Sequence, residues 1–234
     1  MLAHQPAMPP HRIFSALRIS ASLRQNSCTM SPVTHFFTGW LVASATTVPL
    51  TRREKILVVA TAVAPDLDGL GLVPELLTRN SAHPLLWFSL YHHSLHTLTF
   101  ALICTITAFL IDRYFYNSAD RNHPASTRPW LTAGLVFISF HLHLLCDLLG
   151  ARGPEGYQWP IPYLKPFSSA MELTWHGQWA LNGWQNFLFT ALLLFTTFWL
   201  AWRNGSSPLE LISPSANQAF IHALRQRFLP RRTN

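Results

Sequence analysis

The stretch FISFHLHLLCDLLG, residues 137–150, decides the fold class because it is an apolar segment that carries His141, His143 and Asp147. Ionisable side chains inside an apolar helix are costly to bury and usually serve a function. His143 and Asp147 are four residues apart, so they share one face of a helix. His141 lies on another face, which favours a structural or supporting role for it. The rest of the chain must supply partners that offset the burial cost.

The composition indicates an integral membrane protein. Of the 234 residues, 49% are hydrophobic and 12% are charged, against about 25% charged in ordinary soluble domains. Several apolar runs approach the ~20 residues that cross a bilayer. These runs occupy about 33–50, 56–64, 97–111, 131–149 and 187–202. We therefore predict an all-α membrane bundle with about four or five embedded helices.

The distribution of basic residues predicts the orientation. With the C-terminus in the cytoplasm and one crossing per apolar run, the outer segments after Met30 carry only Arg79, Arg152 and Lys165. The inner segments carry 11 basic residues, namely Arg52, Arg53, Lys55, Arg113, Arg121, Arg128, Arg203, Arg225, Arg227, Arg231 and Arg232. This asymmetry is what the positive-inside rule describes. Since orientation accounts for the basic residues, we expect a bilayer and no nucleic acid as partner. The alternative is a soluble nucleic-acid enzyme whose apolar runs form its core.

The two ends of the chain differ from its middle. Residues 1–29 contain Arg12, Arg18 and Arg24 but no acidic residue. This composition is typical of a transit peptide, or of a start codon assigned too far upstream. We favour the second interpretation and treat 1–29 as a dispensable or mis-assigned extension. Residues 30–203 then form the membrane domain, and 204–234 form a basic cytoplasmic tail.

The candidate metal ligands all fall near the outer, periplasmic face in this orientation. They begin or end successive apolar runs although they are far apart in the sequence. The set comprises His35, Asp66, Asp68, His92, His93, His96, His143 and Asp147. Imidazole and carboxylate ligands together suit zinc, and also manganese or iron. The sequence therefore predicts a site for one or two divalent ions.

Within this set some assignments stay open. His92 and His96 are four residues apart and His93 and His96 are three apart, so either pair can converge on an ion. Asp68 serves either as a ligand or as a general base on a metal-activated water. Taken alone, Asp66 and Asp68 also fit the solvated end of a helix, and the histidines of 92–96 fit a solvated turn.

Arg152 follows the helix that contains Asp147. An arginine there is placed to hold a substrate phosphate, because its guanidinium binds phosphate oxygens in pairs. It fits equally well as a surface charge of the loop that follows.

Five stretches together resemble one family: MSPVTHFFTGW, APDLDGLG, YHHSLHTL, HLHLLCDLLGARGPEGYQWPIPYLKPFS and WQN. It is the bacterial membrane-bound, metal-dependent hydrolase family whose better-known member is regulated by the LexA repressor. The resemblance covers essentially residues 30–202. The family is distantly similar to zinc-dependent phospholipase C and to single-strand-specific zinc nucleases, which are all-α and bind clusters of zinc ions.

The resemblance implies ligands as well as a fold. A His-xxx-Asp pair in those enzymes corresponds to His143 and Asp147, an early histidine to His35, and an aspartate to Asp66 or Asp68. A following histidine corresponds to the 92–96 cluster, where HHSLHT is shorter than the usual family stretch and has His93 where arginine is common. No His-xxx-Glu follows Asp147, which favours one or two ions over a larger cluster.

These observations predict a membrane-bound hydrolase that cleaves a phosphoester, such as a phospholipid, through a metal-activated water. Two metals about 4 Å apart clamp the attacking and leaving oxygens of such a bond. The alternative is a membrane metal-binding protein without catalysis, which would bind the ion but turn nothing over.

Overall fold

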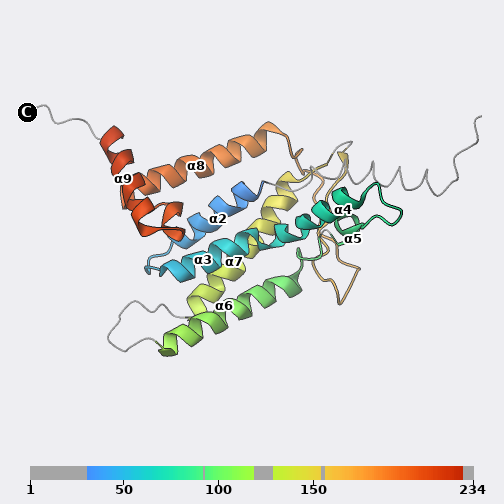
Figure 1. Cartoon of the computed structure of the whole chain (residues 1–234), viewed down its shortest axis with the longest axis horizontal. Helices are drawn as coiled ribbons and strands as arrows, with labels where there is room; N and C mark the ends of the chain where they lie inside the picture. The colour runs from blue at the N-terminus through green and yellow to red at the C-terminus, as the bar shows by residue number, and fades with distance from the viewer. Residues whose placement is uncertain (1–30, 92, 119–128, 154–155, 229–234) are drawn as a thin grey trace, which may run out of the picture.

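The computed structural model describes residues 31–91, 93–118, 129–153 and 156–228. The predicted extension 1–29 therefore lies outside the described residues. The described chain is a bundle of helices without strands (Figure 1). Each predicted apolar run contributes one helix: α2 (Pro32–Ser44), α3 (Arg52–Val63), α6 (Leu98–Ser118), α7 (Pro129–Gly150) and α8 (Trp184–Asn204). The predicted all-α membrane bundle is confirmed.

Within the described residues, four helical segments are long and apolar enough to cross a membrane. They are Arg52–Thr78, Leu98–Phe115, Pro129–Gly150 and Trp184–Asn204. Helix α2 has 13 residues and so measures about 20 Å, less than the ~30 Å of bilayer hydrocarbon. It lies between α8 and α3 (Figure 1), and its Thr34 hydroxyl is 2.8 Å from that of Thr190 in α8.

The second membrane segment continues beyond the predicted run. Helix α3 begins with a capping box between Thr51 and Glu54 and passes into the 3₁₀ helix η1 (Ala64–Gly71) and then α4 (Leu72–Thr78). Pro65 has no N–H to donate to the preceding turn, so the backbone tightens there. The sequence predicted that the apolar run at about 56–64 ends at Asp66 and Asp68. That expectation was wrong, and Asp66 instead lies within a continuing helical segment.

Helices α2, α3 and α7 approach one another closely around Gly39. A Cβ atom at Gly39 would lie 2.5 Å from Ala62 Cβ and 3.1 Å from Val59 Cα. From α7, the Ser139 hydroxyl donates a hydrogen bond to the Val58 carbonyl over 3.0 Å. Since His35 lies one turn before Gly39, this contact sets the position of His35 relative to α7.

The loop between α7 and α8 is irregular but held by hydrogen bonds. Its described residues form two isolated bridges, Arg152 with Ala180 and Ile161 with Leu173. At the start of α8, the Asn186 amide donates to the carbonyls of Gly150 and Leu181, each over 2.8 Å. These bonds hold the loop against the end of α7 that carries Asp147.

The opposite end of the bundle carries the C-terminal segment. Its described part forms η3 (Pro208–Leu211) and α9 (Pro214–Phe228), where the sequence suggested a basic tail. Lys55 Nζ lies 2.7 Å from Glu210 Oε1, and Arg225 donates to the Trp202 carbonyl. Figure 1 shows α9 and the start of α3 at one end of the bundle, with α4 and α5 (Trp87–Tyr91) at the other.

Replacing Gly39 with alanine tests this packing. We expect Gly39→Ala to lower the free energy of unfolding by about 1–3 kcal/mol, because the added methyl group overpacks the α2–α3 contact. Gly134→Ala in α7 is the matched control, since a Cβ at Gly134 meets nothing within 4 Å. Thermal unfolding in detergent measures both. An equal midpoint for the two variants would contradict the close approach.

Candidate metal centre

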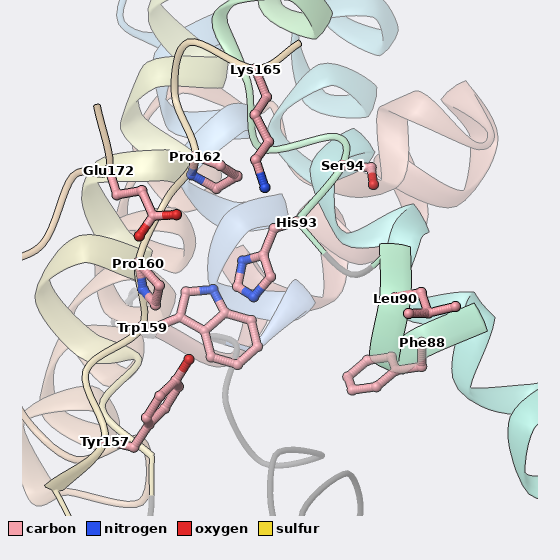
Figure 2. A pocket seen from close by; sticks show the side chains of 10 residues that line it. All are labelled: Phe88, Leu90, His93, Ser94, Tyr157, Trp159, Pro160, Pro162, Lys165 and Glu172. Atoms are coloured by element: carbon pink, nitrogen blue, oxygen red, sulfur yellow. The ribbon is translucent and has the colours of Figure 1, made fainter. Parts of the chain in front are cut away.

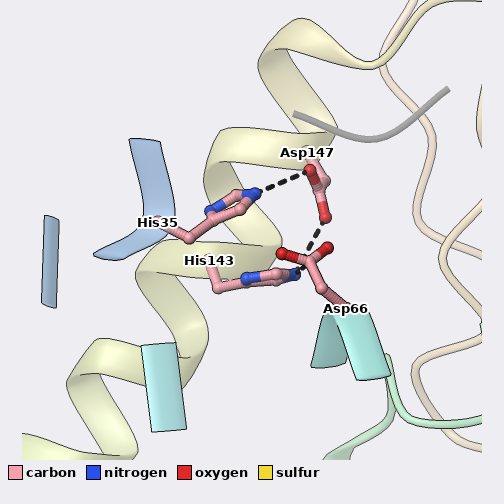
Figure 3. Close-up of side chains that lie close together, drawn as sticks. All are labelled: His35, Asp66, His143 and Asp147. Atoms are coloured by element: carbon pink, nitrogen blue, oxygen red, sulfur yellow. Dashed lines mark ion pairs between the residues drawn. The ribbon is translucent and has the colours of Figure 1, made fainter. Parts of the chain in front are cut away.

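Four side chains from three elements meet inside the bundle (Figure 3). His35 comes from α2, Asp66 from η1, and His143 and Asp147 from α7. Each offers one ligand atom, and these atoms all lie within 4.8 Å of one another. His35, His143 and Asp147 are at most 1% exposed. The structure thus brings together half of the eight candidate ligands in a group that could hold a metal ion.

The Asp147 carboxylate faces three imidazoles. Its Oδ1 lies 3.3 Å from His35 Nε2, and its Oδ2 lies 3.0 Å from His143 Nε2. The same Oδ2 lies 3.4 Å from His96 Nε2. His96 precedes α6 and is fully buried. The carboxylate is therefore positioned to share a cation with these histidines.

A hydrogen bond to the backbone fixes the orientation of the His143 ring. Its Nδ1–H donates to the Ala62 carbonyl over 2.7 Å, which leaves the Nε2 lone pair directed at Asp147 and Asp66. A ligating histidine typically donates its other ring nitrogen to a carbonyl or carboxylate in this way. The geometry of His143 is therefore that of a metal ligand.

Asp66 supplies the observation that tests whether an ion fits. Its carboxylate is 9% exposed, and Oδ1 lies 3.9 Å from His143 Nε2. Neither oxygen accepts a hydrogen bond from the described residues. A buried carboxylate without donors is costly unless a cation lies nearby. Two imidazoles and two carboxylates suit zinc, manganese or iron, so the residues fit a divalent ion.

Asp68 lies beside this group and contacts His96. Its Oδ2 accepts from the backbone N–H groups of His93 and Leu95, over 2.8 and 3.2 Å, and lies 3.1 Å from His96 Nδ1. Burial lowers the pKa of His96, but the Asp147 and Asp68 carboxylates outweigh it and raise the pKa to about 9. The contacts of Asp68 are those of a residue that orients His96.

His93 and His141 lie apart from the four-residue group. His92 is outside the described residues. His93 has a positive φ of 88°, and its ring centroid lies 4.0 Å from that of Trp159. His141 Nδ1–H donates to the Phe137 carbonyl and its Nε2 accepts from the Tyr163 hydroxyl, each over 2.8 Å. His141 thus connects α7 to the loop between α7 and α8.

A pocket of about 240 Å³ opens next to the centre (Figure 2). Gln178 joins the pocket to the centre, because its Oε1 accepts from the backbone N–H of Trp159 and its Nε2 donates to the backbone carbonyl of Asp147. Lys165 lines this pocket and Arg152 does not. The contacts that place Arg152 are backbone bonds to Trp179 and Leu181. Lys165 was not predicted as a site residue, because its loop carries no periodic signal.

Comparison with known proteins gives one family. Residues 30–220 match the family model described as YdjM inner membrane protein. Comparison with curated proteins and with solved structures gives no match. The expected similarity to phospholipase C therefore stays a prediction.

Elemental analysis of the detergent-purified full chain tests the centre. We expect a bound divalent metal that is largely lost in Asp147→Asn, because the variant removes the charge that faces His35, His143 and His96. A chelator should lower the melting temperature of the parent protein, since an ion bound only by the folded state stabilises it. His222→Gln, an exposed histidine on α9, is the matched control. Equal metal content in all three proteins would contradict the assignment.

Proposed function

This chain belongs to the YdjM inner membrane protein family, and on that premise we propose that it is a metal-dependent hydrolase. The proposed substrate is a phosphoester, such as that of a phospholipid. The observation that carries the proposal is the buried group of His35, Asp66, His143 and Asp147. These side chains lie inside apolar helices, where ionisable groups are rare and mark functional sites.

The division of roles follows from the contacts. A divalent ion, when bound, polarises the phosphoryl oxygen and lowers the pKa of a water molecule. His35, Asp66, His143 and Asp147 would hold it. His96 would carry a proton at Nε2, because Asp68 fixes its Nδ1 and turns Nε2 toward the centre. Asp68 would therefore act through His96 and not on the substrate.

We place the centre on the periplasmic side of the inner membrane. The opposite end of the bundle holds the start of α3, with Arg52 and Arg53, and the contact of Arg225 with the end of α8. Basic residues favour the cytoplasmic side. A centre at the other end would then lie near the outer-leaflet headgroups, where phosphoesters are abundant.

The depth of the ligands favours a second candidate function. His35, His143 and Asp147 are at most 1% exposed, as the ligands of a structural ion would be. A non-catalytic metal-binding membrane protein would keep its metal and show no turnover. The two functions predict different effects of a substitution at Asp68. Asp68 orients His96, the proposed proton carrier, but it is not among the residues that would hold the ion.

A phosphoester and phospholipid screen with metal-loaded protein separates them. We expect Asp147→Asn to abolish hydrolysis together with metal binding. Asp68→Asn should keep the metal and lower kcat by about 10- to 100-fold, because partners that orient a site residue typically contribute that much. Stoichiometric metal in the parent, without release of phosphate or headgroup from any substrate, would reject the hydrolase and support the structural ion.

A further inference from the structure

Among the described residues, the pocket beside the metal centre is lined by one side chain of each charge. Of the ten described residues that line it, the charged ones are Lys165 and Glu172. Both side chains point into the pocket (Figure 2), and in the described part of the chain no ion pair joins them to each other or to a third residue. Both charges are therefore open to a ligand. A ligand that satisfies both has an anionic group and a cationic group.

The walls of the pocket suit the cationic half of such a ligand. Tyr157 lines the pocket and is 47% exposed, so its ring is accessible to a ligand, whereas Trp159 is 1% exposed and packs on His93. Aromatic faces attract an ammonium group, and a carboxylate adds charge and hydrogen bonding. Lys165 suits the anionic half, because an ammonium is a common partner of phosphate.

The rim of the pocket suits acyl chains. Leu90 lines the pocket and is 64% exposed, and its helix neighbour Trp87 is 52% exposed. Phe167, two residues after Lys165, is 87% exposed. Exposed aromatic and aliphatic side chains beside a polar pocket are typical of a surface that lies at the headgroup level of a bilayer.

We infer that this pocket binds the aminoalkyl phosphate headgroup of a zwitterionic phospholipid, with the phosphate at Lys165 and the ammonium at Glu172. The inference rests on the proposed function only in taking the bound lipid as substrate. It assigns the headgroup specificity to Glu172 and general phosphate affinity to Lys165.

Contacts connect the pocket to the metal centre. His93 packs on Trp159, and its ring centroid lies 5.9 Å from that of His96. The His93 N–H donates to Asp68, which also contacts His96. The pocket therefore adjoins the side chains around Asp147.

Equilibrium binding to metal-loaded, detergent-purified protein tests the pocket. The probes are short-chain phosphatidylethanolamine, short-chain phosphatidylglycerol and glycerophosphoethanolamine, which lacks acyl chains. We expect the parent to prefer phosphatidylethanolamine about fivefold over phosphatidylglycerol. Glu172→Gln should raise the Kd for phosphatidylethanolamine about fivefold and leave that for phosphatidylglycerol unchanged. Lys165→Met should weaken both lipids. Glu210→Gln and Arg79→Gln are matched controls outside the pocket and should change neither.

Each result decides a separate point. Equal affinity for the two lipids in the parent, or an unchanged preference in Glu172→Gln, would overturn the headgroup assignment. Glycerophosphoethanolamine binding as tightly as the lipid would overturn the lipid source in favour of a soluble aminoalkyl phosphate. Hydrolysis is assayed separately on the same samples. A headgroup preference without cleavage rejects the hydrolase function but supports the headgroup assignment. Cleavage without a headgroup preference supports the hydrolase function but rejects the headgroup assignment.

Discussion

The charge of Asp147 is the constraint on which the rest of the structure depends. Its carboxylate is fully buried in α7, and an uncompensated ion in such a place costs several kcal/mol. His35, His96 and His143 approach it from three parts of the chain. The N-terminal turn of α2, the segment before α6 and the last turns of α7 must therefore converge at one depth.

Much of this arrangement follows from the sequence because membrane helices have a strong local signal. The run predicted at 131–149 is the helix Pro129–Gly150, and the one at 187–202 is Trp184–Asn204. The His143–Asp147 spacing placed both side chains on one helix face before any tertiary contact was known. The continuation past Pro65 was missed, since proline usually ends a helix and nothing local indicates that a 3₁₀ segment will follow.

The parts that the sequence did not predict depend on irregular backbone. The sequence does not distinguish the roles of Asp66 and Asp68, yet the Asp68 carboxylate accepts hydrogen bonds from the backbone N–H groups of His93 and Leu95. His93 makes that contact with a positive φ, which no pattern indicates. Gln178 likewise joins Trp159 to Asp147 across a loop without periodicity. Such long-range bonds are set by tertiary folding, so a single sequence does not predict them.

The shortness of α2 has a consequence for the lipids around it. A helix about 10 Å shorter than the hydrocarbon layer creates hydrophobic mismatch, which a bilayer relieves by thinning locally at a cost of fractions of a kcal/mol per Å. Phe36 and Phe37 of this helix are only half-buried. Thinning there draws headgroups inward toward the level of His35. The fold would then deform the membrane around itself and shorten the vertical path of a lipid to the interior of the protein.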